Sequence, residues 1–307
     1  MTAVAGSAGS IRDVSKIITA HKQEEGGGFI VRRPFPGLGL SFVDPFLLLD
    51  EMGPVSYGPG EAVGAPDHPH RGFETVTYVL EGELEHEDSA GHRGALRAGD
   101  VQWMTAGAGI IHSEMPSRRI REQGGRVHGF QIWINLPARL KMTRPRYQEI
   151  ASGDIPRAQT ADGRARVQVI AGEALGARAV IDTHTPIVYQ DWSLDPGADV
   201  TVPLPRDHRA LVFVFEGSAK VGDGGDAGDN GTLVEDGRLA MLGDGDAVRL
   251  RGADGPGRLL LLSGVPINEP VARYGPFVMN TEAEIMQAAR DFQSGRMGEI
   301  TRTATVG

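Results

Sequence analysis

The sequence predicts an all-β protein of the sandwich or barrel type, and three observations support this prediction. Short apolar runs recur along the chain and are bounded by turn residues such as Glu81-Gly82 and Glu216-Gly217. The chain contains 43 Gly and 19 Pro, which suit many short strands and tight turns better than long helices. Its 307 residues suffice for about two domains, or for one large β unit.

Strands are expected in both halves of the chain. They cover residues 75–80, 101–104 and 129–136 in the first half, and 167–170, 210–215, 238–242, 247–250 and 258–262 in the second. A stretch rich in Pro and Arg, 136–145, is expected to link the halves, because its prolines would interrupt a long helix.

Only the C-terminal segment predicts a clear helix. Thr281 and Glu284 have the spacing of a capping box, in which each side chain bonds the backbone beside the other. Ile285, Met286, Ala289 and Phe292 then form an apolar face, and Gly295 suits the end of the helix.

Composition and charge exclude several classes of function. The 31 Lys and Arg against 40 Asp and Glu give a net charge of −9 with no basic run, which argues against direct binding of nucleic acid. The chain has no Cys, which excludes disulfides, thiolate catalysis and cysteine-bound metals. No apolar run approaches the roughly 20 residues of a membrane helix. The N-terminus lacks a signal pattern, so we expect a cytoplasmic protein with a flexible lead-in over residues 1–25.

A weak internal repeat relates the two halves. Residues 76–86 resemble 211–221 with an offset of 135, and 96–101 resemble 243–248 with an offset of 146. The difference fits a longer, solvated hairpin loop over 222–232.

Two pairs of side chains point to a metal site. His68 and His70 are two residues apart, so on a strand both project to the same side, and His112 and Glu114 repeat this spacing. Neighbouring strands bearing these pairs would bring three imidazoles and one carboxylate to one centre. Such donors suit divalent metals such as Fe(II) and leave coordination positions open. One such pair alone is more often a polar turn, but two same-face pairs favour a metal site.

Several nearby residues have two interpretations each. Glu74 could face the same cavity as a supporting residue or alternative ligand, or could pair at the barrel surface. His86 and His92 are expected in an exposed hairpin, although His92 could reach the cavity mouth. His128 could be a satisfied core histidine or could support the site. Aromatic and amide side chains could line the cavity or fill the core, namely Phe73, Trp103, Gln131 and Trp133. Four arginines could form an anion-attracting entrance or a solvated patch, namely Arg71, Arg118, Arg119 and Arg121.

Longer motifs in this order resemble the pirin family of the cupin superfamily. They are HPHRGFET (68–75), EDSAGH (87–92), GDVQWMTAG (99–107), GIIHSEMP (109–116) and PVARYGPFVMNT (270–281). The resemblance implies a bicupin, with two antiparallel jelly-roll barrels and a short C-terminal helix. It implies a metal-binding cupin domain over 26–140 and a second cupin domain over 141–307. It also carries the ligand roles for one iron to His68, His70, His112 and Glu114.

The repeat predicts that the second domain holds no metal. With the two offsets, His68 and His70 correspond to Pro203 and Pro205, and His112 and Glu114 correspond to Arg258 and Leu260. None of these four is a metal ligand in such a site. His208 lies nearby in the sequence and is expected to be a surface-loop histidine.

The resemblance implies two candidate functions. The first is a quercetin 2,3-dioxygenase, which opens a flavonol ring with O₂ and releases carbon monoxide. Glu114 would accept the flavonol proton, with Glu74 as the fallback base. The alternative is a redox-sensitive metal-binding regulator that binds a protein partner, as a cofactor of transcription or of a metabolic enzyme. We expect a monomer with one Fe(II) per chain, although other divalent metals suit the same donors.

Overall fold

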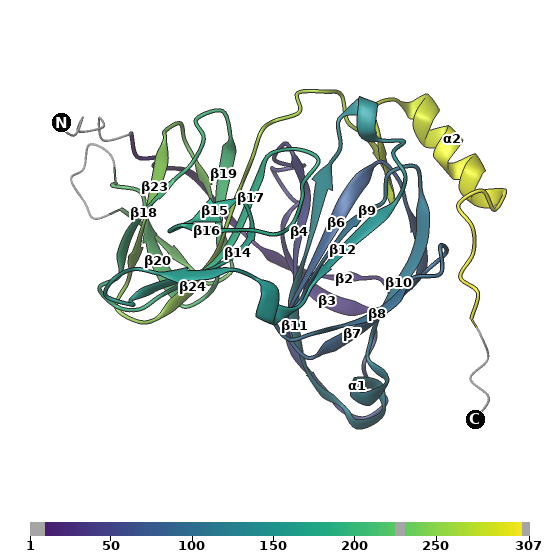
Figure 1. Ribbon diagram of the computed structural model, residues 1–307, viewed down its shortest axis with the longest axis horizontal. Helices are drawn as coiled ribbons and strands as arrows, with labels where there is room; N and C mark the ends of the chain where they lie inside the picture. The colour runs from purple at the N-terminus through teal and green to yellow at the C-terminus, as the bar shows by residue number, and fades with distance from the viewer. Residues whose placement is uncertain (1–9, 225–230, 303–307) are drawn as a thin grey trace. The chain divides into compact units, whose positions relative to one another are not determined.

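The computed structural model describes residues 10–224 and 231–302, and they form two compact units built mainly of antiparallel strands (Figure 1). The unit we call the first barrel comprises His21–Asp154 and the segment that begins at Ile267. The second barrel comprises Ile155–Pro266 and the segment that ends at Ala20. The predicted all-β architecture with a short C-terminal helix is confirmed.

The first barrel pairs a seven-stranded sheet with a four-stranded sheet. The larger sheet has the order β12 (Arg146–Ile150), β9 (Val101–Thr105), β6 (Phe73–Glu81), β11 (Gly125–Asn135), β4 (Phe46–Tyr57), β3 (Phe29–Phe35), β2 (His21–Glu25). The smaller sheet has the order β5 (Ala65–His70), β10 (Ile110–Pro116), β7 (Glu83–Asp88), β8 (Arg93–Arg97). Three short helical elements belong to this unit, namely α1 (Arg118–Gln123), η1 (Ala138–Leu140) and η2 (Ser152–Asp154).

The second barrel repeats this arrangement. Its larger sheet has the order β1 (Val14–Thr19), β22 (Arg238–Leu242), β19 (Arg209–Glu216), β24 (Gly257–Gly264), β17 (Ile187–Leu194), β14 (Ala165–Ala171), β13 (Arg157–Gln159). Its smaller sheet has the order β18 (Asp199–Pro203), β23 (Ala247–Gly252), β20 (Ser218–Val221), β21 (Thr232–Glu235), and a separate hairpin joins β15 (Glu173–Ala174) to β16 (Ala177–Arg178). Aliphatic side chains from both sheets fill the interior. Of the predicted loop over 222–232, residues 225–230 lie outside the described residues.

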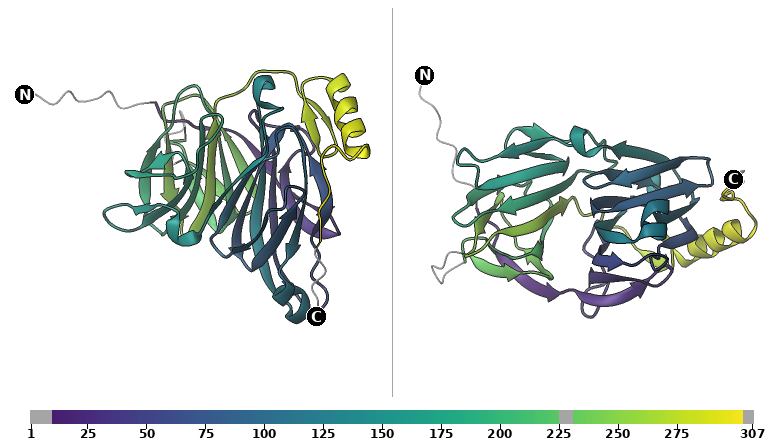
Figure 2. Two further views of the ribbon diagram at one scale, coloured as in Figure 1. Left: turned by 45° about the vertical axis from the view of Figure 1, so that its right-hand side comes forward. Right: turned by 90° about the horizontal axis from the view of Figure 1, so that it is seen from below.

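Strands replace part of the lead-in expected over residues 1–25. Strand β1 pairs with β22, so this N-terminal strand lies beside the green strands of the second barrel (Figure 2), and β2 pairs with β3 in the first. The register of β1 shifts between Val14 and Lys16, and this irregularity breaks the alternation that would have marked a strand. Its partner is also more than two hundred residues away, which no local pattern reveals.

The C-terminal segment returns to the first barrel. It forms the hairpin β25 (Ala272–Tyr274)–β26 (Phe277–Met279) and the helix α2 (Glu282–Gln293). Both bonds of the predicted capping box are present. The backbone N–H of Glu284 donates to Thr281 Oγ1, and the backbone N–H of Thr281 donates to the Glu284 carboxylate. The first barrel therefore includes a C-terminal segment, and the second barrel includes an N-terminal one. The expected division into 26–140 and 141–307 does not contain this exchange. No helix within 10–224 and 231–302 is long and apolar enough to cross a membrane.

Candidate metal centre

Three histidines converge on the inner face of the smaller sheet of the first barrel. Strand β5 supplies His68 and His70, and the adjacent strand β10 supplies His112, which lies opposite His68 in the register. The ring centroids are 4.4 to 4.9 Å apart, and one nitrogen from each ring lies within 4.8 Å of the others. The two-residue spacing thus places both β5 imidazoles on one side, as the sequence predicted.

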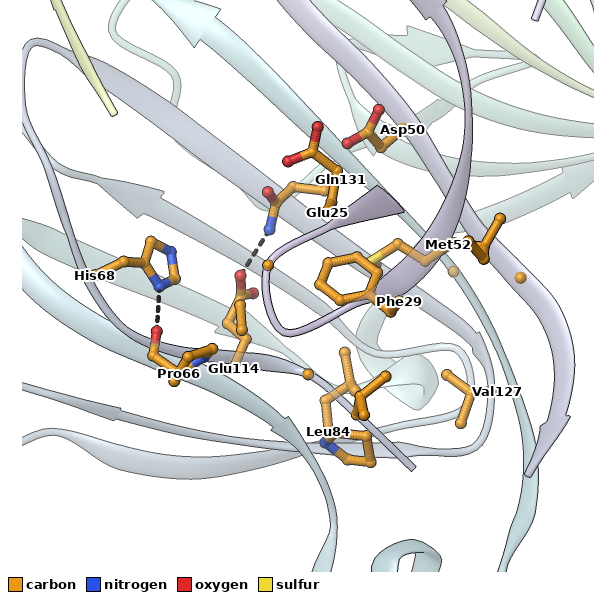
Figure 3. A pocket seen from close by; sticks show the side chains of 18 of the residues that line it. Glu25, Phe29, Asp50, Met52, Pro66, His68, Leu84, Glu114, Val127 and Gln131 are labelled. Carbon is orange, nitrogen blue, oxygen red and sulfur yellow. Dashed lines mark hydrogen bonds between the residues drawn. The ribbon is translucent and has the colours of Figure 1, made fainter. Parts of the chain in front are cut away.

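The hydrogen bond of His68 leaves a lone pair that faces the other two rings. The Nδ1 of His68 is 2.7 Å from the carbonyl oxygen of Pro66, which can only accept, so Nδ1 carries the proton and Nε2 a lone pair (Figure 3). That Nε2 lies 3.0 Å from the Nε2 of His70, and neither ring nitrogen of the buried His112 has a hydrogen-bond partner. Buried nitrogens arranged in this way fit a metal cation between them.

The histidines are also held in the form that binds metals. Burial, together with His68 and His112, holds the pKa of His70 well below its usual value of 6.5. Burial and His68 lower the pKa of His112 in the same direction. Both imidazoles are therefore neutral near pH 7, as metal ligation requires.

Glu114 borders the same cavity without belonging to the histidine group. The register of β10 shifts between His112 and Glu114, and the carboxylate accepts hydrogen bonds from Thr77 Oγ1 at 2.7 Å and from Gln131 Nε2 at 2.6 Å. The amide of Gln131 is itself oriented, because its Oε1 accepts a bond from Trp133 Nε1 at 3.1 Å. The structure thus unites three of the four predicted ligands, and coordination by Glu114 stays a prediction.

A cavity of about 500 Å³ opens from the histidines into the first barrel (Figure 3). His68, His70 and Glu114 lie on its wall. Most of the remaining wall is apolar, with Phe29, Leu48, Met52, Val55, Val79, Leu84, Val127 and Trp133 among its residues. Gln131 and Trp133 line the cavity together, whereas Trp103 is fully buried and does not line it. The cavity is suited to a flat, largely apolar ligand.

Glu74 does not reach this cavity. Thr75 and Thr77 lie opposite Trp133 and Gln131 on β11, so the odd-numbered residues of β6 face inward. Side chains alternate along a strand, and Glu74 therefore projects to the opposite face, where it accepts a bond from Thr105 at 2.6 Å. The expectation that Glu74 supports the site assumed one uninterrupted strand from His70 to Glu74. The chain instead leaves β5 and enters β6 at Arg71-Gly72, and this break reverses the side to which Glu74 projects.

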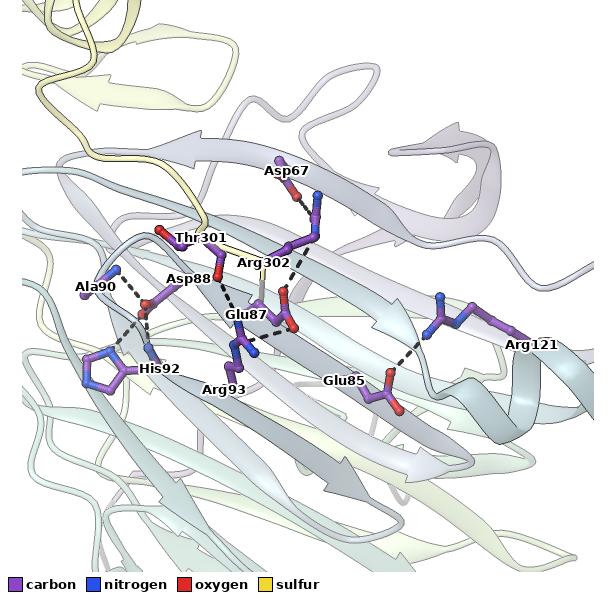
Figure 4. A network of polar contacts seen from close by, with 10 residues as sticks. All are labelled: Asp67, Glu85, Glu87, Asp88, Ala90, His92, Arg93, Arg121, Thr301 and Arg302. Atoms are coloured by element: carbon purple, nitrogen blue, oxygen red, sulfur yellow. Dashed lines mark hydrogen bonds and ion pairs between the residues drawn. The ribbon is translucent and has the colours of Figure 1, made fainter. Parts of the chain in front are cut away.

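The structure also corrects the expected positions of two histidines. His86 is 3% exposed, not in an exposed hairpin, and its Nε2 is 2.7 Å from Glu149. His208 is buried and lies 3.0 Å from Ser263 Oγ, not on a surface loop. In both cases the neighbouring side chain comes from a distant strand, Glu149 on β12 and Ser263 on β24. His92 is exposed, as expected, and bonds Asp88 (Figure 4).

His128 is a buried, hydrogen-bonded histidine, as one interpretation predicted, and it also lines the cavity, as the other allowed. It is buried, and its Nε2 is 2.9 Å from Glu51 Oε1.

The four arginines do not form one basic patch. Arg71 is buried and pairs with Asp291 at 2.8 Å, which anchors α2 to the barrel. The other three lie on α1, where each pairs with a glutamate, as Arg121 does with Glu85 (Figure 4). Their charge is neutralised locally, so they do not form an anion-attracting entrance.

Sequence reasoning missed a charged group on the far wall of the cavity. Arg33 bonds both oxygens of Asp50 at 2.5 Å and lies 2.6 Å from Glu25. Burial raises the pKa of Asp50 to about 6, although Arg33 opposes this shift. Arg273 from β25 lines the same cavity. An aspartate directly after the apolar run 46–49 was a visible signal, but Arg273 is too distant in the sequence to be linked to it.

Within the part of the second barrel that the structure describes, no comparable group is present. Strands β18 and β23 occupy the places in its smaller sheet that β5 and β10 occupy in the first. Their buried residues are all aliphatic, namely Val200, Val202, Ala247, Val248 and Leu250. Arg258 and Leu260 lie on β24, which corresponds to β11, so the offset of 146 was wrong. Among the residues described, the histidine group is the only cluster of His, Asp or Glu that could hold a metal.

Comparison with known proteins agrees with this architecture. The family model described as Pirin matches residues 28–134, and that described as Pirin C-terminal cupin domain matches residues 189–298. A pirin-like protein of Solanum lycopersicum is 45% identical over 288 residues, which cover 94% of this chain and 93% of the relative. Pirin of Homo sapiens is 43% identical over 293 residues, 94% of this chain and 95% of that protein.

A solved structure extends the comparison to the fold. The crystal structure of a quercetin 2,3-dioxygenase from Acinetobacter baumannii superposes with a TM-score of 0.87 at 39% sequence identity. The superposition covers 95% of this chain and 100% of that one. The predicted bicupin architecture is thereby confirmed.

Proposed function

The chain belongs to the pirin family, and we propose that it is a metal-dependent dioxygenase that cleaves flavonols such as quercetin with O₂. One observation carries this proposal. Three imidazoles, two of them buried, place one ring nitrogen each within 4.8 Å of the others, beside an apolar cavity of about 500 Å³. The similarity to a quercetin 2,3-dioxygenase supports the same substrate class.

The residues at the site suggest how the metal would be held. His68, His70 and His112 would ligate it, with Glu114 as the fourth ligand, and iron(II) is the metal that we propose. When bound, such a metal acts as a Lewis acid toward the flavonol hydroxyl and activates O₂. Other divalent metals fit the same donors.

The protein would contribute orientation, proton transfer and exclusion of water. Glu114 would accept the proton of the flavonol hydroxyl, because its carboxylate borders the cavity beside the histidines. Thr77 and Gln131 hold that carboxylate in place through two short hydrogen bonds. The apolar wall would contact the flat rings and keep water from the reacting carbon atoms.

Anaerobic purification followed by metal analysis, quercetin decay and O₂ uptake tests this proposal. We expect about one equivalent of metal per chain and equal consumption of quercetin and O₂. Glu114→Ala and His112→Ala should lose both metal and turnover. His92→Ala is the matched control, because this histidine is exposed and outside the cavity.

Two results would contradict the proposal. Full activity in Glu114→Ala would remove its role as base and ligand. One equivalent of metal without consumption of quercetin or O₂ would exclude the dioxygenase. The second result would favour the alternative, a redox-sensitive regulator that binds a protein partner.

A further inference from the structure

Arg273 is a cation on the cavity wall, and the protein itself uses few of its hydrogen-bond donors. Its guanidinium lies over the ring of Trp133 at 4.8 Å, and its Nη1 donates one hydrogen bond to Leu47 O at 3.3 Å. Within the described part of the chain it forms no ion pair, although its side chain lines the cavity. Since a guanidinium has five N–H donors, most of those of Arg273 are available to a ligand.

The charged groups near Arg273 on this wall, Arg33, Asp50 and Glu25, bond one another. Both oxygens of Asp50 are bonded to Arg33, and Glu25 is bonded to Arg33 and to Gln23 Nε2 at 2.8 Å. These carboxylates act on Arg273 only at longer range, so they do not occupy its donors. They do set a polar boundary at this end of an otherwise apolar cavity.

The ring of Trp133 lies close to both Arg273 and the histidine group. The ring of Trp133 contacts the Arg273 guanidinium on one side, and its centroid is 5.1 Å from that of His70. A ligand of one or two aromatic rings that lies along Trp133 could therefore reach the histidines with one end and Arg273 with the other. The planar fork of an arginine suits a carboxylate in particular, because both oxygens can be bonded at once.

We propose that the cavity binds aromatic carboxylates, with the carboxylate on Arg273 and a hydroxyl oxygen at the histidine cluster. This inference rests on the proposed metal site and adds aromatic carboxylates to the flavonols of the proposed function as ligands of the same cavity. Arg273 thus acts as a specificity-determining residue, and it selects an anionic ligand over a neutral one of the same shape.

Binding of two isosteric probes tests this preference. Protocatechuate and its carboxamide share the catechol that chelates a metal and differ only in the charge of the other end. We would measure both dissociation constants by calorimetry on protein loaded with zinc, which carries out no redox turnover. The wild type should bind the acid about tenfold more tightly, as a charge-assisted bidentate contact implies.

Variants assign this preference to Arg273. Arg273→Met keeps an unbranched apolar side chain over Trp133 and should reduce the ratio to about one, with the affinity for the carboxamide within about twofold of wild type. Arg273→Lys should retain part of the preference. Arg121→Met is the control, because Arg121 lies on α1 outside the cavity, and it should keep the full ratio.

The outcomes separate this inference from the proposed function. An equal affinity for both probes in the wild type, or an unchanged ratio in Arg273→Met, would overturn the anion preference while leaving the metal site intact. Failure to bind zinc would instead contradict the metal site. In that case biphenyl carboxylate and biphenyl carboxamide, tested on metal-free protein, still decide whether Arg273 selects the anion.

Discussion

Gly72 is the position where one methyl group should do most damage to the frame of the metal site. It has a φ of +89°, and a Cβ at this position would lie 1.9 Å from the carbonyl oxygen of Val278 on β26. The surroundings cannot yield, because Val278 N donates to Arg71 O at 3.0 Å and Lys141 Nζ bonds the carbonyls of both Gly72 and Val278. Gly72→Ala therefore forces the hairpin away from the strand that carries His70.

The expected loss in the free energy of unfolding has two parts. A left-handed conformation costs an alanine about 1–2 kcal/mol. Displacement of the buried hairpin adds about 2–3 kcal/mol through overpacking and weakened bonds to Lys141. Gly91→Ala is the matched control, since Gly91 has a φ of +88° and a Cβ there would meet nothing within 4 Å. Gly91→Ala should therefore show only the first part.

Urea unfolding followed by tryptophan fluorescence measures the difference. The chain has three tryptophans, and a Trp192→Phe background leaves only Trp103 and Trp133, both in the first barrel. For a unit of this size, a difference of 2–3 kcal/mol should lower the midpoint of Gly72→Ala by roughly 1 M relative to Gly91→Ala. Coinciding midpoints would refute the reasoning, because they would mean that the hairpin adapts without cost.

Two further predictions concern stability. Burial holds the pKa values of His70 and His112 below 6.5, so the unfolded chain binds protons there before the folded one does. These two histidines should therefore destabilise metal-free protein increasingly as pH falls below 6.5, whereas Asp50, with its pKa raised to about 6, acts in the opposite direction. Thermal unfolding of wild type and His112→Gln at pH 7.5 and pH 5.5 isolates the histidine contribution, and the same change of melting temperature in both proteins would contradict it. Thr281→Ala removes the cap of α2 and should cost about 1 kcal/mol. Hydrogen exchange in the first turn of α2 measures this loss, and unchanged protection there would argue against the cap.

Local patterns in the sequence determined eight of the strands, the C-terminal helix and the three converging histidines. The i, i+2 spacing on a strand fixes the side to which His68 and His70 project, and a capping box depends on residues three apart. Such features need no knowledge of distant partners. The same two-residue spacing places Gln131 and Trp133 on one face of β11, where both line the cavity.

The tertiary structure decided what depends on long-range pairing. Strand β1 has its partner on β22, and Arg273 reaches the cavity from the far end of the chain. The orientation of Glu74 depends on how the chain passes through Arg71 and Gly72. A shift of one residue there moves every later side chain of the strand to the opposite face. Burial of His86 and His208 likewise depends on partners from distant strands. Sequence spacing could therefore predict the histidine cluster, but only the folded chain shows which charges share its cavity.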